Sequence, residues 1–235
     1  EGGSLRRGAA AATAGAATAE VGLELGALAH LLVAAEAAAH AGLAAVLGAV
    51  AVAAGAAVAG AEIAENALHL ARRTLPNAEF KVMDITAHRW ERTFDLVVCA
   101  DVVEHIDDDV AALRHMAEMV NPGGYIVVAT LQGRMRGFET TIGHLRNYAP
   151  GELQRKMGQA GLNVDRVVEW GFPLYSPLYR NLLEFLGNRG TMGRFGVMRK
   201  LISHALYILF LLNSAHRGDY IFVRARKDLW PRKSS

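Results

Sequence analysis

Residues 94–130 constrain the fold more than any other stretch, because they read in one pass as strand, loop, helix, turn and strand. Residues 94–100 (FDLVVCA) form a short, Val-rich apolar run, which is typical of a strand buried on both faces of a parallel sheet. Residues 106–120 carry apolar side chains at three- and four-residue spacing, which predicts a helix packed on that sheet. Residues 121–124 (NPGG) should end the helix, and residues 125–130 are predicted to form a second buried strand.

Polar side chains follow the first of these strands. In an open α/β sheet the ligand crevice lies beyond the carboxyl ends of the strands. Ala100, Asp101, Glu104 and His105 end or follow the strand, so we expect all four at the site.

The length and the cysteine count limit the class of protein. The chain of 235 residues can form one large α/β domain, or one domain with an elaboration. Its single cysteine, Cys99, excludes an internal disulfide framework and favours a reducing compartment. No secretory pattern opens the chain, and we therefore expect a cytoplasmic protein.

Charge is distributed unevenly along the chain. Residues 171–235 hold 11 Lys or Arg against 3 Asp or Glu, whereas residues 1–170 hold 14 against 20. A basic tail beside an acidic body indicates an anionic partner. Because the basic residues alternate with long apolar runs, a membrane surface suits them better than nucleic acid, which we do not expect as a partner.

Residues 94–130 resemble part of a known protein family. FDLVVCADVVEHI (94–106) followed by NPGGYIVVAT (121–130) is similar to the fourth strand, the following loop and the fifth strand of class I S-adenosylmethionine-dependent methyltransferases. The resemblance extends from about Leu31 to Lys227 and includes the small-molecule and ubiquinone-pathway enzymes. It implies a Rossmann-like seven-stranded sheet, mostly parallel with an antiparallel closing strand, and S-adenosylmethionine as cofactor.

The resemblance also divides the chain. Residues 1–26 would be an N-terminal helical or disordered extension, residues 27–170 and 218–228 the methyltransferase-like core, and residues 171–217 a helical cap insertion. The expected strands are residues 31–35, 57–61, 79–85, 94–100, 125–130, 162–168 and 219–227.

The glycine loop after the first strand departs from the family pattern. Aligned on Glu36, the three glycine positions are occupied by Ala38, His40 and Gly42, so only the third is glycine. Residues 27–61 contain 18 Ala and 4 Gly, an unusual composition for a cofactor site. Either the loop has lost its glycines, or the alanines stand for side chains that were not identified.

The same stretch allows a different reading. Residues 42–61 run for twenty residues without a charge, which is long enough to span a bilayer. Against this, Ala and Gly are only weakly apolar, and no Lys or Arg flanks the run.

Two downstream acids complete the expected cofactor site. Glu62, after the second strand, resembles the carboxylate that accepts hydrogen bonds from the ribose hydroxyls, and Asp84 one that accepts from the adenine amino group. A helix-start acid and an ordinary loop acid are the alternatives. The expected cofactor-binding residues are Glu36, Ala38, His40, Gly42, Glu62, Ile63, Asp84, Ile85 and Ala100.

Two histidines are the candidates for chemistry. Methyl transfer needs an aligned nucleophile, and a base only where the acceptor loses a proton. His105 and His144, the latter in GHLRNYAPGEL, would orient or deprotonate the acceptor. Asp101, Glu104, His105 and His144 are also similar to a set that holds Mg, Mn or Zn in ubiquinone-pathway and small-RNA O-methyltransferases, although those enzymes usually have Glu in place of Asp101. Structural roles such as helix capping remain the third alternative.

The insertion should decide acceptor specificity. Residues 178–213 contain apolar runs too short to span a membrane, so they form a buried cap, a homodimer contact or a peripheral membrane contact. We therefore expect O-methylation of a hydrophobic or lipid-linked small molecule. A catalytically silent scaffold with this fold is the main alternative, and a nicotinamide-dependent oxidoreductase or a membrane-spanning protein would be others.

Overall fold

The computed structural model describes residues 56–186 and 197–229. Its main sheet has the strand order β3-β4-β6-β5. The strands of this sheet are β3 Phe94–Ala100, β4 Val120–Leu131, β5 Leu162–Trp170 and β6 Tyr220–Lys227. A second, two-stranded parallel sheet pairs β1 (Ala59–Glu62) with β2 (Glu79–Val82).

This arrangement differs from the single seven-stranded sheet that the sequence predicted. The described residues form a mixed four-stranded sheet and a separate two-stranded one. β3 and β4 run parallel, and β6 is antiparallel to both β4 and β5, which confirms the antiparallel closing strand. The strand expected at residues 31–35 lies outside the described residues, as do the extension 1–26 and the stretch 42–55.

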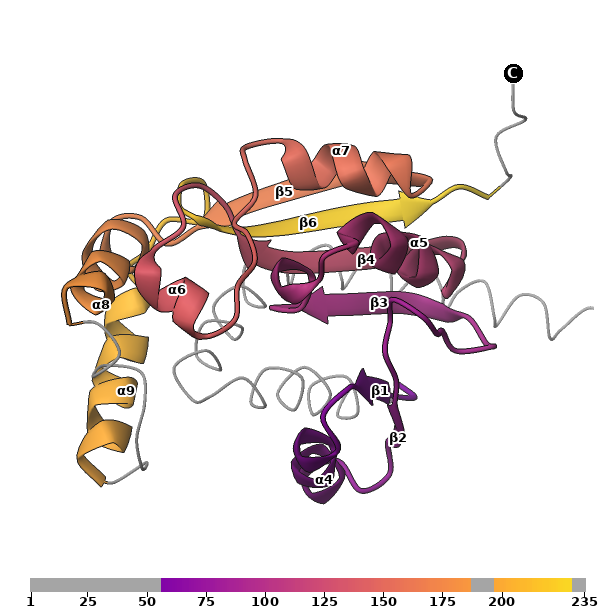
Figure 1. Cartoon of the computed structure of the whole chain (residues 1–235), viewed down its shortest axis with the longest axis horizontal. Helices are drawn as coiled ribbons and strands as arrows, with labels where there is room; N and C mark the ends of the chain where they lie inside the picture. The colour runs from indigo at the N-terminus through magenta and orange to yellow at the C-terminus, as the bar shows by residue number, and fades with distance from the viewer. Residues whose placement is uncertain (1–55, 187–196, 230–235) are drawn as a thin grey trace, which may run out of the picture.

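One face of the main sheet is covered by two helices, α5 (Asp109–Glu118) and α7 (Glu152–Gln159), as Figure 1 shows. Helix α5 begins later than the expected residue 106, because the Asp108 side chain accepts a hydrogen bond from the Ala111 N–H at 2.9 Å and caps the helix there. Its apolar stripe, with Leu113 fully buried, packs in the main core against β4.

β4 also differs from expectation, because it begins at Val120 rather than at residue 125. The NPGG residues form an irregularity inside the strand, between the pairs Phe94–Val120 and Leu96–Tyr125. Gly123 has a φ of 81°, and a Cβ on Gly124 would lie 2.9 Å from the Asp95 carbonyl oxygen. Glycine therefore allows the chain to kink and continue pairing instead of turning away.

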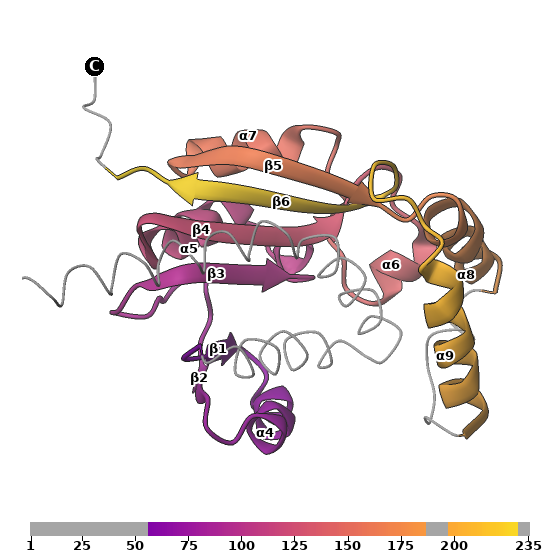
Figure 2. The ribbon, with the colours of Figure 1, turned by 180° about the vertical axis from the view of Figure 1, so that it is seen from behind.

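Four elements gather at the carboxyl ends of β3 and β4, and three of them, α6, α8 and α9, are labelled in Figures 1 and 2. They are α6 Gly137–Thr141, the π-helical turn η2 Leu174–Tyr179, α8 Arg180–Leu186 and α9 Val197–Phe210. A second core ties them to the sheet. In it, the Tyr175 ring lies 5.6 Å from that of Phe210 and 5.1 Å from that of Trp170.

The remaining helix, α4 (Glu65–Thr74), packs beside β1 and β2. Among the described residues, none of the helices has the length and apolarity needed to cross a membrane. The Cys99 side chain is buried in the core, and burial raises the pKa of its thiol.

Candidate functional site

Two segments that are distant in sequence form the site. The first is the loop after β3, which contains the single turn η1 (Val103–His105), and the second is the segment after α6 that contains His144. The Leu145 N–H donates to the Glu104 carbonyl at 2.9 Å, and the Tyr148 hydroxyl oxygen lies 3.3 Å from the Val103 carbonyl oxygen. One backbone hydrogen bond and one side-chain contact therefore hold the two segments side by side at the carboxyl end of the sheet.

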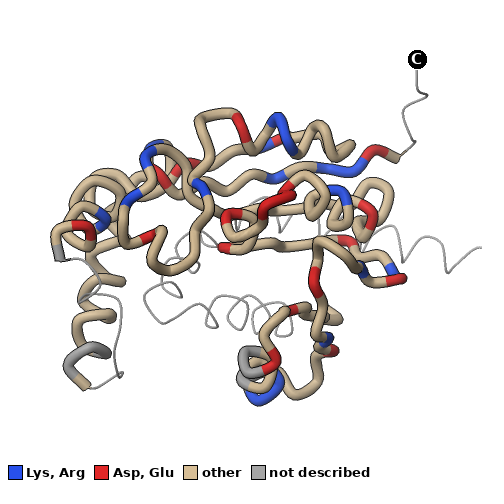
Figure 3. The backbone as a smooth tube through the Cα atoms, in the orientation of Figure 1, with Lys and Arg blue, Asp and Glu red and all other residues tan. Residues whose placement is uncertain are grey.

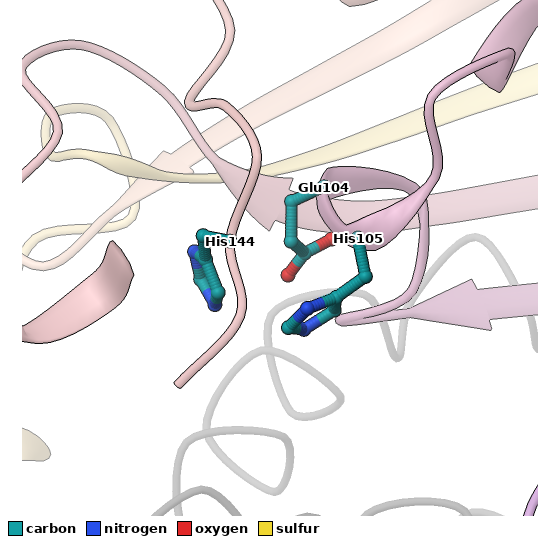
Figure 4. A group of neighbouring side chains, drawn as sticks. All are labelled: Glu104, His105 and His144. Carbon is teal, nitrogen blue, oxygen red and sulfur yellow. The ribbon is translucent and has the colours of Figure 1, made fainter. Parts of the chain in front are cut away.

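Glu104, His105 and His144 meet where these segments touch (Figure 4). One potential ligand atom from each side chain lies within 4.8 Å of the other two. The histidine rings are edge-on, with centroids 4.7 Å apart and an angle of 85° between their planes. Glu104 and His144 are buried, and His105 is partly exposed. The cluster therefore combines one carboxylate and two imidazoles with access from one side.

Hydrogen bonds orient two members of the cluster. The Thr130 hydroxyl, at the end of β4, donates to Glu104 Oε2 at 2.9 Å. His105 Nδ1 lies 2.9 Å from the Gly143 carbonyl oxygen. Because a carbonyl oxygen only accepts, Nδ1 carries the proton of this bond, and the neutral ring presents the lone pair of Nε2. Nε2 is the atom that a base or a metal ligand would use.

Asp101 is placed differently from the other predicted ligands. It has a left-handed backbone, with a φ of 53°, and its Oδ1 accepts a hydrogen bond from the Tyr220 hydroxyl at 2.8 Å. Burial raises the pKa of its carboxyl to about 6, while the Tyr220 bond and the nearby His105 oppose the rise. Asp101 does not belong to the cluster defined by the 4.8 Å limit, which Glu104, His105 and His144 satisfy.

A buried ion pair supports the segment that carries His144. Glu139, in α6, accepts hydrogen bonds from Nη2 of the Arg180 guanidinium, from its Nε at 2.9 Å, and from Asn147 Nδ2 at 2.9 Å. Its carbonyl oxygen accepts from the His144 N–H at 3.0 Å. The side chains of Arg180 and Glu139 are 1% and 0% exposed. The pair therefore links α8 directly to the backbone of a cluster residue.

A second buried acid, Asp109, fixes the other end of the same segment. Its Oδ2 accepts from Lys156 Nζ at 2.7 Å, from the Tyr148 hydroxyl at 2.8 Å and from Arg146 Nη1 at 3.3 Å. Burial and the Asp109 carboxylate raise the pKa of Tyr148. Sequence reasoning missed both buried acids. Each acid lies in the first turn of its helix, which the sequence could show. Acids at that position are usually exposed and interact with the helix dipole, so their burial was not expected.

The predicted cofactor residues that the structure describes lie at or just after the carboxyl ends of β1, β2 and β3, which belong to two separate sheets. Glu62 ends β1, and its Oε1 accepts from the Ala64 N–H at 3.0 Å. Ala100 ends β3. Ile63, just after β1, is 67% exposed. Glu36, Ala38, His40 and Gly42 lie outside the described residues.

Asp84 and Ile85 form a turn after β2, which ends at Val82 rather than at residue 85. Asp84 Oδ1 accepts from the Thr86 N–H at 2.8 Å and from the Thr86 hydroxyl at 2.7 Å, and these bonds lower the pKa of its carboxyl. His115, on α5, bonds the Ile85 carbonyl through Nδ1 at 2.7 Å. This turn is therefore fixed from both sides.

Two surface hollows lie near the main sheet. The larger, about 580 Å³, is lined by residues that include Arg89, Trp90 and Lys227. It lies at the amino end of β3, whereas the Glu104, His105 and His144 cluster lies at the carboxyl end. The smaller, about 420 Å³, is at the carboxyl end and is lined by residues that include Arg136 and Asn181. Only the second is on the side of the sheet where the chemistry of an α/β protein is expected.

Comparisons with known proteins point in one direction. A family model described as "Methyltransferase domain" matches residues 39–128. The chain is similar to a ubiquinone biosynthesis O-methyltransferase of Nitrosospira multiformis, with 27% identity over 52% of this chain and 60% of the relative. The chain spans between 36% and 62% of the length of the first four curated relatives.

Solved structures are similar at the level of the fold. A possible histamine N-methyltransferase from Thermotoga maritima superimposes with a TM-score of 0.50 and 17% identity, covering 76% of both chains. A putative sarcosine dimethylglycine methyltransferase from Galdieria sulphuraria gives 0.51 and 14%, covering 74% of this chain and 71% of its own. Both support a Rossmann-like α/β architecture.

Proposed function

Because the chain belongs to the class I S-adenosylmethionine-dependent methyltransferases, we propose that it transfers the methyl group of this cofactor to an oxygen of a small, lipophilic acceptor. The observation that carries the proposal is the meeting of Glu104, His105 and His144 at the carboxyl end of β3. The partly exposed His105 opens this cluster to a ligand, and the neighbouring ends of β1 and β2 carry two carboxylates for a cofactor.

The described residues fit the cofactor. Glu62 Oε1 accepts a hydrogen bond from the Ala64 N–H in the following loop, and Oε2 would accept one from a ribose hydroxyl. The turn at Asp84 and Ile85 is rigid enough to receive an adenine ring, and the exposed Ile63 offers it an apolar surface. Ala100 would line the same edge, with Glu36, Ala38, His40 and Gly42 completing the site. The cofactor supplies an electrophilic methyl group on a sulfonium.

The two histidines would act on the acceptor. A hydroxyl of the acceptor would donate its proton to the lone pair on Nε2 of His105, which the Gly143 carbonyl keeps in this tautomer. His144, held through its backbone by Glu139, would fix the direction of the attacking oxygen. The proton would therefore move to imidazole as the acceptor oxygen takes the methyl group, whose bond to the sulfonium sulfur breaks and leaves a neutral thioether.

The same donors fit a divalent cation. One carboxylate and two imidazoles suit Mg, Mn or Zn, and Asp101 lies in the same loop as a further oxygen donor. Such an ion would supply Lewis acidity toward an acceptor oxygen.

Cofactor binding tests the proposal. In calorimetric titration with S-adenosylhomocysteine, we expect micromolar affinity for the wild type and a loss of about 10- to 100-fold in Glu62→Ala, because hydrogen bonds to a charged group are removed. The exposed Glu65→Ala, at the start of α4, is the matched control and should bind as the wild type does. A folded protein that fails to bind millimolar ligand would contradict the proposal and favour the catalytically silent scaffold.

Metal binding is tested separately, without cofactor. If Glu104 is a ligand, titration with Mn²⁺ should show one site whose affinity falls by at least about tenfold in Glu104→Gln. Glu118→Gln, at an exposed position of α5, should leave the titration unchanged. Absence of a Mn²⁺ site in the wild type would assign the histidines to direct action on the acceptor.

A further inference from the structure

Helix α9 is apolar on two faces. Its inner face contributes Leu206 and Phe210 to the second core, beside Trp170 and Tyr175. Its outer face is exposed, and the large apolar side chains on it recur at the spacing of a helical stripe. The residues of this stripe, with their exposed fractions, are Leu201 61%, Ile202 51%, Ile208 65%, Leu209 42% and, just past the helix end, Leu212 72%.

Helix α8 extends this apolar surface. Phe185 is 87% exposed and Leu182 is 50% exposed. Both helices contact the turn η2, and Figures 1 and 2 show them on the same end of the molecule. A soluble domain normally buries such large side chains, and clusters of them mark a surface with a partner.

The charge of the region is positive. Residues 178–213 contain five Lys or Arg and one acid, Glu184, but one of the five, Arg180, is buried in the ion pair with Glu139. Glu184 is already engaged, because it accepts from the Gly137 N–H at 2.7 Å. Helix α9 contains no Asp or Glu, as its colouring in Figure 3 illustrates. The other four basic residues, Arg189, Arg194, Arg199 and Lys200, follow Glu184 in the sequence, and no acid lies between Glu184 and residue 213.

We propose that this face of α8 and α9 binds the surface of an anionic lipid bilayer. The 14 residues of α9 extend about 21 Å, which is shorter than the hydrocarbon core, so the helix would lie in the interface. A second copy of the chain is a poorer occupant, because a two-fold contact would bring two sets of basic residues together.

The surface is coupled to the site by packing. Phe210 contacts Tyr175, whose ring lies 6.3 Å from that of Tyr220, and the Tyr220 hydroxyl bonds Asp101. Bilayer binding would therefore place the carboxyl-end edge of the sheet at the lipid, from which a lipophilic acceptor can enter. This consequence rests on the proposed function, whereas lipid binding itself does not.

Vesicle sedimentation of the full chain tests the inference. We expect the wild type to bind phosphatidylcholine vesicles containing phosphatidylglycerol at least about tenfold more tightly than vesicles of phosphatidylcholine alone, because anionic lipid attracts basic residues. The double variant Leu201→Glu/Ile208→Glu should lose at least about tenfold in affinity, since two apolar side chains are replaced by charges. Val167→Glu, at an exposed apolar position on β5, is the matched control and should bind as the wild type does.

Other outcomes would overturn the inference. One is a wild type that ignores anionic vesicles, and another is a double variant that binds them unchanged. A wild-type dimer that the double variant dissociates, with no vesicle binding, would assign the surface to self-association. Titration of each variant with S-adenosylhomocysteine reports folding and cofactor binding independently. Vesicle binding without cofactor binding would therefore overturn the proposed function and leave the lipid surface intact.

Discussion

Glu139→Ala is expected to lower the free energy of unfolding by about 3–5 kcal/mol, because the Arg180 guanidinium stays buried and keeps only the partly exposed Asp219 as a carboxylate partner. The Arg180 and Glu139 side chains are almost completely shielded from water, so solvent cannot compensate for the lost carboxylate. Urea or thermal denaturation followed by circular dichroism would measure the change.

The control for this prediction is the pair between Asp165 and Arg224, whose side chains are 35% and 16% exposed. Asp165→Ala should cost no more than about 1 kcal/mol, as is usual for exposed ion pairs. Equal losses in the two variants would contradict the assignment of Glu139 as the buried support of the His144 segment.

His144→Ala should slow methyl transfer by about 10²-fold, because the acceptor oxygen loses the side chain that fixes its direction of attack. The reason is the position of this buried imidazole, with its ring centroid 4.7 Å from that of His105. Formation of S-adenosylhomocysteine can be followed with an alkyl-substituted catechol as the probe acceptor, because it combines hydroxyl nucleophiles with an apolar tail.

The exposed His216→Ala is the matched control and should turn over as the wild type does. Cofactor affinity should stay within a few-fold of the wild type in both variants, which separates a role in chemistry from a loss of folding. A His144→Ala protein with unchanged turnover would remove this residue from the mechanism.

The stretch at residues 94–130 shows how much local pattern can reveal. Residues 94–100 were predicted to form a strand buried on both faces. β3 has these bounds, but Leu96 and Val98 are exposed, so the predicted burial was wrong. The helix and the following strand were also predicted, but their ends moved, because Asp108 capped α5 late and Gly123 let β4 begin early. Periodicity reports which side chains are buried, whereas the ends of elements depend on individual hydrogen bonds and dihedral angles.

The candidate site was only partly predictable. The order of strands placed Glu104 and His105 at a carboxyl end, and the resemblance added His144 from a later loop. Thr130, Glu139 and Tyr220 were missed, because nothing in their immediate sequence marks them as partners of the site.

The sequence by itself determined the class of fold, the strands and helices around residues 94–130, and the edge of the sheet where chemistry would occur. Those properties follow from apolar periodicity and from the rule that parallel strands present their carboxyl ends together. Only the tertiary structure decided which polar groups meet. Arg180 pairs with Glu139 across 41 residues, and Tyr220 with Asp101 across 119. Such bonds form because burial leaves a charge or hydroxyl with no water, so that its partner must come from whichever segment the fold brings beside it.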